Sequence, residues 1–142
     1  YVNPNPMVGA VIVKKGKVIG QGFHEKYGEV HAERNALASC TESPEGAVMY
    51  VTLEPCQMCS GAIVQSRMTR VVVGCMNPKA GCAGSILNLL QMPQFNHQVE
   101  LTTGVLEEEC SQMMKSFFKE LRKKQKMKKK EQESANMPEE NP

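Results

Sequence analysis

Short apolar runs alternate with polar and glycine-rich breaks through the first half of the chain. Residues 8–13 form a β-branched run, and the Lys-Gly-Lys sequence at 15–17 predicts a tight hairpin turn into a second strand at 18–23. Residues 47–53 are mostly apolar, which suits a buried central strand. Further along, residues 69–75 and 99–102 predict a fourth and a fifth strand.

Helical periodicity fills the intervals between these strands. Residues 31–40 place three apolar side chains on one helical face before a Ser-Pro-Glu-Gly break. A second helix is predicted to begin at Pro55 and to continue over residues 56–67, and residues 85–90 predict a short third helix. From Val105 onward, apolar residues recur at helical spacing, a pattern more typical of core packing than of a binding surface.

The resulting order β-β-α-β-α-β-α-β-α predicts a layered α/β/α domain. A chain of 142 residues suits one domain with a single core. We expect this domain to span residues 1–122, and we expect residues 123–142 to form a basic and then acidic tail that is frayed or disordered. Because the chain opens at Tyr1 rather than at a methionine, we also expect a piece that lacks an N-terminal helix.

The overall composition is that of a soluble globular protein, with 41% hydrophobic and 23% charged residues. No apolar run approaches the roughly 20 residues that span a bilayer, and no signal peptide opens the chain. We therefore expect a cytoplasmic protein with no membrane partner. Six cysteines in that setting argue for reduced thiols or metal ligation rather than for a disulfide framework.

The net charge of +2 hides an uneven distribution along the chain. Eight basic residues lie between Lys119 and Lys130, whereas the residues after them are acidic and polar. A basic run of this kind, taken alone, is more typical of a solvated helix end than of a nucleic-acid site. The charge pattern by itself therefore assigns no partner.

Two short segments carry residues suited to metal chemistry, and each lies where a loop or strand is expected to become a helix. Cys56 and Cys59 are three residues apart, so on a helix their sulfurs share a face and can hold one ion. Cys56 also falls in the first helical turn, where the helix dipole favours a thiolate. His31 would add a nitrogen ligand from the other helix start, and one nitrogen with two sulfurs suits zinc better than magnesium or calcium.

Three protein ligands would leave the fourth tetrahedral position of zinc open to water, whose pKa falls to about 7 on the metal. Glu33, two residues beyond His31, is poorly placed as a ligand but well placed to move the proton of that water to a ring nitrogen and then to a departing amine. The alternative is a non-enzymatic module with a closed structural zinc site. Its fourth ligand would be one of the remaining thiols: Cys40, Cys75, Cys82 or Cys110.

The His-Ala-Glu sequence that starts at His31, followed by Pro55, Cys56 and Cys59, resembles the zinc-dependent cytidine and deoxycytidylate deaminase superfamily. The resemblance covers nearly the whole chain. It implies a three-layer α/β/α cytidine-deaminase-like fold with a central mixed five-stranded sheet, Zn²⁺ as cofactor and hydrolytic removal of an amino group from a nucleobase. Adenine and cytosine present similar amidine centres to this chemistry, so cytosine deamination is one alternative.

From residue 51 onward the chain resembles bacterial tRNA adenosine deaminases, homodimers that convert the wobble adenosine of tRNA to inosine. The stretches that carry this resemblance are residues 55–62, 77–81, 84–85, 95–97 and 108–110. The resemblance implies tRNA or single-stranded nucleic acid as partner and a homodimeric assembly. It places Asn77 and Lys79 beside the flipped nucleotide, although Asn77 stands where an aspartate is common. It also assigns the C-terminal helix to RNA through Phe118, Lys119, Arg122 and Lys123.

Residues 3–9 and 22–33 are instead similar to the pyrimidine deaminase of riboflavin biosynthesis, in which Asn5 and His24 would match substrate-contacting positions. That family separates its two zinc cysteines by a longer insert and usually carries a reductase domain, for which the length leaves no room. The change from one resemblance to the other falls within residues 51–56, so a natural or engineered chimera is an alternative. Adenosine deamination in tRNA is our leading hypothesis, and deamination of a riboflavin-pathway pyrimidine nucleotide is the next.

Overall fold

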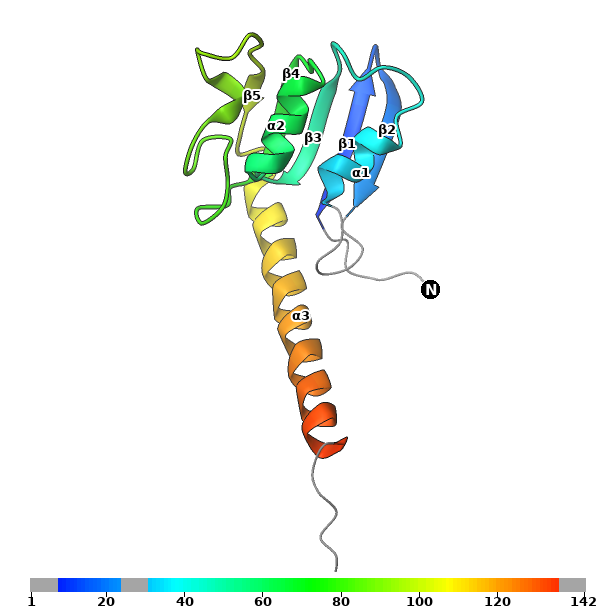
Figure 1. Cartoon of the computed structure of the whole chain (residues 1–142), viewed down its shortest axis with the longest axis vertical. Helices are drawn as coiled ribbons and strands as arrows, with labels where there is room; N and C mark the ends of the chain where they lie inside the picture. The colour runs from blue at the N-terminus through cyan, green and yellow to red at the C-terminus, as the bar shows by residue number, and fades with distance from the viewer. Residues whose placement is uncertain (1–7, 24–30, 136–142) are drawn as a thin grey trace, which may run out of the picture.

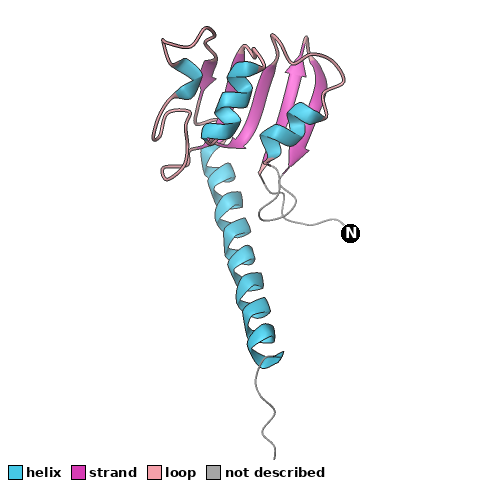
Figure 2. Cartoon of the chain, viewed as in Figure 1, coloured by secondary structure: helices cyan, strands magenta, loops and turns pink. Residues whose placement is uncertain are grey.

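A five-stranded sheet flanked by helices forms the folded body of the chain (Figures 1 and 2). The computed structural model describes residues 8–23 and 31–135. In chain order, the elements are β1 (Gly9–Lys14), β2 (Lys17–Phe23), α1 (Ala32–Ala38), β3 (Val48–Leu53), α2 (Gln57–Gln65), β4 (Arg70–Cys75), the short 3-10 helix η1 (Leu89–Gln91), β5 (Glu100–Thr102) and α3 (Glu107–Ala135).

The strands lie in the order β2-β1-β3-β4-β5. β1 runs antiparallel to both β2 and β3, whereas the pairs β3–β4 and β4–β5 are parallel. The predicted hairpin turn is confirmed, because Lys15 and Gly16 have φ angles of 51° and 75°, as a two-residue turn between twisted strands requires. The mixed five-stranded sheet expected from the sequence is therefore present.

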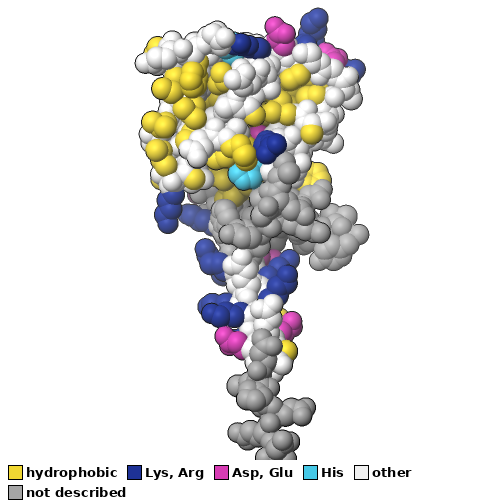
Figure 3. Space-filling model, in the orientation of Figure 1, with side chains coloured by type: hydrophobic (Ala, Val, Ile, Leu, Met, Phe, Trp, Pro, Cys, Tyr) yellow, Lys and Arg dark blue, Asp and Glu magenta, His cyan; other side chains and the backbone are white. Residues whose placement is uncertain are grey.

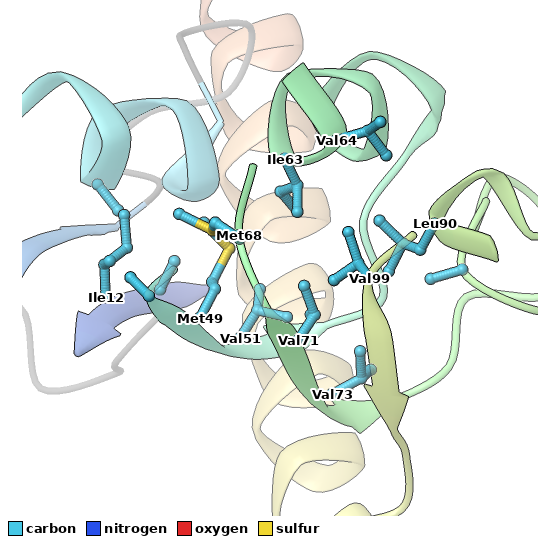
Figure 4. Close-up of a cluster of buried hydrophobic side chains, with 14 of the residues drawn as sticks. Ile12, Met49, Val51, Ile63, Val64, Met68, Val71, Val73, Leu90 and Val99 are labelled. Carbon is cyan, nitrogen blue, oxygen red and sulfur yellow. The ribbon is translucent and has the colours of Figure 1, made fainter. Parts of the chain in front are cut away.

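The main hydrophobic core lies between one face of the sheet and the helices α1 and α2 (Figure 4). Alternate residues of the central strands turn to this face, so Ile12, Met49 and Val71 are fully buried. Ala36 of α1 and Ile63 of α2 close over them from the helical side. This packing fixes the positions of both helices, and with them the positions of the residues at their N-termini.

The first turns of α3 cover part of the opposite face of the sheet and form the third layer. A side chain at Gly74 of β4 would lie 2.4 Å from the Cys110 sulfur, so this glycine permits the close approach of the helix. Farther across the same face, Tyr50 is 48% exposed, because α3 does not reach that far. The three-layer α/β/α arrangement is confirmed.

Beyond its first turns, α3 projects away from the sheet as a straight helix (Figure 1). The expected domain boundary after residue 122 falls within this helix, which is continuous to Ala135. The division into a domain at 1–122 and a tail at 123–142 stays a prediction. Within residues 8–23 and 31–135, no helix is both long enough and apolar enough to cross a membrane.

The helix predicted over residues 85–90 is wrong. Only the 3-10 turn η1 forms there, after an isolated bridge between Ala83 and Asn88. The physical reason lies in the backbone of this segment: the Leu89 N–H donates to the carbonyl of Cys82 at 2.9 Å, whereas a helix would need it to donate to the carbonyl of Ser85. Gly84, with a φ of 131°, adds a backbone conformation that no helix contains.

A buried and an exposed valine in the sheet provide a test of this core. We expect Val71→Ala, which opens a cavity at a fully buried position, to lower the free energy of unfolding by about 2–4 kcal/mol. The matched change Val18→Ala, at a side chain that is 54% exposed, should cost less than about 1 kcal/mol. Urea unfolding followed by circular dichroism measures both, and equal losses would contradict the assigned packing.

Candidate metal centre

Two helix N-termini bring together the three residues predicted to bind metal. His31 is the N-cap of α1, and Cys56 is the N-cap of α2; both have extended backbone angles at the point where the helix begins. Cys59 lies in the first turn of α2 and is fully buried. Because α1 and α2 lie on the same face of the sheet, these junctions meet at one point (Figure 1).

The donor atoms of these residues have the separations of a tetrahedral zinc site. His31 Nδ1 lies 3.5 Å from Cys56 Sγ and 3.3 Å from Cys59 Sγ, and all three atoms lie within 4.8 Å of one another. Zinc bonds of about 2.0 Å to nitrogen and about 2.3 Å to sulfur, at a tetrahedral angle, place the two donor types roughly 3.5 Å apart. The donor set and its spacing therefore fit Zn²⁺.

The protein environment of Cys59 disfavours a free thiolate. Burial raises the pKa of the Cys59 thiol, and the nearby Glu33 carboxylate and Cys56 raise it further by charge and by hydrogen bonding. Two sulfurs and a carboxylate concentrated at one buried point need a compensating positive charge. A divalent cation between His31 and the sulfurs would supply that charge.

Glu33 lies beside this cluster without belonging to it. Its side chain is 4% exposed, it sits in the first turn of α1, and it hydrogen-bonds with Cys59. Among the described residues, the metal-binding group contains only His31, Cys56 and Cys59. The four other thiols, at Cys40, Cys75, Cys82 and Cys110, are not part of that group. The closed site of the structural-zinc alternative is therefore not formed by the cysteines.

A second buried acid, which the sequence analysis did not identify, lies directly before the metal-binding segment. Glu54 is 2% exposed and accepts hydrogen bonds from the N–H groups of Asn77, Ala83 and Ser85 and from the Ser85 hydroxyl. Burial raises the pKa of this carboxyl, but those donors lower it by more, so its pKa lies below the ordinary range. The only sequence signal was a charged residue at the end of a buried strand.

The loop that follows β4 carries two of the predicted substrate contacts. Asn77 is half-buried, Lys79 is exposed, and both line a groove between this loop and α3. Lys115 and Arg122 line the same groove from the helix. Lys115 was missed by the sequence analysis because it precedes the dense basic run, although it lies one helical turn before Lys119.

The remaining predicted contacts divide into two groups. Asn5 and His24 lie outside the described residues, and so does the side chain of Phe118. Lys119, Arg122 and Lys123 are exposed on α3. The structure thus brings the metal-binding residues together and places Asn77, Lys79 and Arg122 around one groove.

Comparison with known proteins identifies relatives of two kinds. Residues 1–75 match the family described as the cytidine and deoxycytidylate deaminase zinc-binding region. A tRNA-specific adenosine deaminase of Bacillus subtilis (strain 168) is 48% identical over 128 residues, which cover 84% of this chain and 80% of that protein. A diaminohydroxyphosphoribosylamino-pyrimidine deaminase of Buchnera aphidicola subsp. Acyrthosiphon pisum (strain APS) is 38% identical over 125 residues, which cover 84% and 82% of the two chains.

A solved structure agrees with these relationships. A chain from structural studies of A-to-I editing by tRNA:A34 deaminases at the wobble position of transfer RNA is similar, with a TM-score of 0.60 and 33% identity. The match covers 68% of this chain and 82% of that one. The Buchnera relative, in turn, is covered over most of its length. A short chain therefore does not by itself exclude a riboflavin-type deaminase, contrary to the length argument made from the sequence.

Removal of one sulfur tests the metal centre. We expect Cys59→Ala to purify without stoichiometric zinc, because two donors cannot hold the ion tightly, whereas Cys40→Ala should keep about one zinc per chain. Elemental analysis of the purified proteins measures the zinc content. Equal zinc in the two variants would contradict the assigned ligands.

Proposed function

Because the chain belongs to the family of zinc-dependent cytidine and deoxycytidylate deaminases, we propose that it hydrolyses the wobble adenosine of a tRNA to inosine. The reaction consumes one water and releases ammonia: the exocyclic C–N bond of adenine breaks and a C–O bond forms at the same carbon. One observation supports a polynucleotide as the substrate. The groove lined by Asn77, Lys79, Lys115 and Arg122 continues into the basic face of α3.

In this proposal, His31, Cys56 and Cys59 hold the zinc ion and Glu33 moves the proton. Zinc held by these three residues would supply an activated water for the attack. Glu33, buried beside Cys59, accepts one proton of the attacking water and passes it to the ring nitrogen, and then carries the second proton of that water to the amine, which departs as ammonia. Burial of Glu33 keeps its carboxylate out of bulk solvent, so the proton stays within the site.

Basic side chains on α3 extend the groove along the helix. Lys115, Lys119, Arg122 and Lys126 are separated by four, three and four residues, which places them on one helical face. From Lys115 to Lys130 the helix rises by about 22 Å, a length that spans several phosphates of a nucleic-acid strand. Figure 3 shows Lys and Arg side chains along the projecting helix. A mononucleotide would use none of this surface, whereas an anticodon stem-loop could use much of it.

Similarity to the Buchnera pyrimidine deaminase supports a second candidate, a riboflavin-pathway pyrimidine nucleotide. Its sequence basis lies in residues 3–9 and 22–33, which include Asn5 and His24. The same metal chemistry serves both substrates, because adenine and the pyrimidine each present an amino group on an amidine-like carbon. The choice of substrate must therefore come from residues outside the metal centre.

We also propose a homodimer that acts in the cytoplasm. Exposed apolar side chains lie on α2 and on the segment after β4, on the face that Figure 3 presents. Clusters of this kind commonly mark contacts between subunits. The residues that a second copy would cover are Met58, Ile86, Leu87 and Phe95. Sedimentation velocity at micromolar concentration measures the assembly state.

Replacement of the proton carrier tests the chemistry. We expect Glu33→Gln to retain zinc and to lower kcat by about 10²–10⁴-fold, because the amide cannot accept the proton. The control Glu42→Gln changes an exposed carboxylate on the surface and should leave kcat unchanged. Ammonia release by both proteins, normalised to zinc content, measures the effect. Full turnover by Glu33→Gln would remove Glu33 from this role.

A direct comparison of substrates tests the proposed function. We expect the protein to form inosine in an anticodon stem-loop with a wobble adenosine and to release little ammonia from the riboflavin-pathway pyrimidine nucleotide. Binding of the stem-loop should weaken steeply with salt, and the double change Lys119→Ala, Arg122→Ala should reduce the log–log salt slope by about 1.5. The control pair Lys15→Ala, Lys17→Ala lies in the β1–β2 hairpin and should leave the slope unchanged. Turnover of the small nucleotide alone would contradict the proposal.

A further inference from the structure

The buried carboxylate of Glu54 is surrounded by donors from a single loop. Oε1 accepts from the N–H of Asn77 at 3.0 Å and from the Ser85 hydroxyl, while Oε2 accepts from the N–H groups of Ala83 and Ser85, each at 3.0 Å. No salt bridge to Glu54 is present among the described residues. The negative charge is thus stabilised by the loop of residues 77–85 alone, through charge-assisted hydrogen bonds.

The loop is shaped to accept this carboxylate. A side chain at Gly81 would lie 2.2–2.4 Å from the carboxylate atoms of Glu54, so residue 81 must be glycine for the loop to pass over the acid. The Gly81 N–H donates to the Asn77 carbonyl at 2.7 Å and closes the loop on itself. The Cys82 N–H donates to the Pro55 carbonyl at 2.8 Å. These contacts join the loop directly to the segment that holds Cys56.

We propose that Glu54 is a positioning residue that holds the loop of residues 77–85 in register with the metal centre, so that Asn77 and Lys79 meet the target nucleotide. This inference rests on the proposed function, because it takes Asn77 and Lys79 as substrate contacts. Glu54 lies two residues before Cys56 in the chain, and its carboxylate holds the backbone of Asn77. This side chain therefore fixes the Asn77 end of the substrate-binding loop to the segment that holds a metal ligand, while the bond from Cys82 to Pro55 fixes the loop nearer its other end.

The distribution of donors makes Glu54→Gln a selective change. If the amide oxygen takes the place of Oε2, it still accepts from the N–H groups of Ala83 and Ser85. The amide nitrogen then replaces Oε1, and the Ser85 hydroxyl can rotate to accept from it. Only the Asn77 N–H is left facing a donor. The change thus releases the Asn77 end of the loop and leaves the Ser85 end attached.

The test combines kinetics with amide hydrogen exchange on the zinc-loaded protein. For Glu54→Gln we expect one zinc per chain, a KM for the anticodon stem-loop raised about tenfold or more, and a smaller change in kcat. Exchange should accelerate at the Asn77 amide and stay slow at Ala83. In the Asn77→Ala background, Glu54→Gln should raise KM by less, because one of the two contacts that it misplaces is already gone.

Controls separate this role from general stability and from the proposed function. Glu45→Gln, at an exposed site, should change neither KM nor exchange. A folded, zinc-loaded Glu54→Gln protein with wild-type KM overturns the positioning role, as does full additivity with Asn77→Ala. If Glu54→Gln does not fold, Ser85→Ala provides the test, because it removes only the hydroxyl that donates to Glu54. A KM raised a few-fold in Ser85→Ala supports the positioning role of Glu54. An unchanged KM overturns that role. Failure of the wild-type protein to form inosine contradicts the proposed function instead.

Discussion

The structure depends on the meeting of two helix N-termini on one face of a sheet. His31 and Cys56 are 25 residues apart in the chain, yet their donor atoms lie 3.5 Å apart because α1 and α2 pack on the same core. A zinc site tolerates displacements of only a few tenths of an ångström in its ligand distances. The core of Ile12, Met49, Ile63 and Val71 is therefore also the frame of the metal centre. Changes far from the metal can affect it by tilting either helix.

The metal-binding residues could be predicted from the sequence because their signal is local. The spacing of Cys56 and Cys59 and the pairing of His31 with Glu33 each lie within a single helical turn, so no knowledge of the fold was needed. Strand patterns were equally local, and all five strands lie close to their predicted positions. The prediction that the metal-binding residues lie at two helix starts is also confirmed, because composition as well as periodicity marks the start of a helix.

Glu54 and the segment after β4 could not be predicted, and for one shared reason. The Glu54 carboxylate accepts hydrogen bonds from the backbone N–H groups of Asn77, Ala83 and Ser85. Every residue type except proline has such an N–H group, so the amino-acid sequence does not show which ones will bind the carboxylate. A backbone hydrogen bond also prevents the helix that the composition of residues 85–90 favours, because the Leu89 N–H donates to the Cys82 carbonyl. The loop's own hydrogen bonds thus overrode a local helical preference. The groove residue Lys115 was missed for a different reason, since only the fold shows which loop the helix passes.

The exposed part of α3 carries many basic side chains. The stability of this helix therefore depends on the ions and polyanions that neutralise their charge. Every side chain from Arg122 to Ala135 is exposed, so this part of the helix buries no apolar face and depends on its own local propensity. Its clustered like charges repel one another at low ionic strength. A bound polyanion would relieve that repulsion, and so would added salt. Salt therefore has two opposite effects on α3: it stabilises the free helix, and it weakens the attraction between the helix and any polyanion.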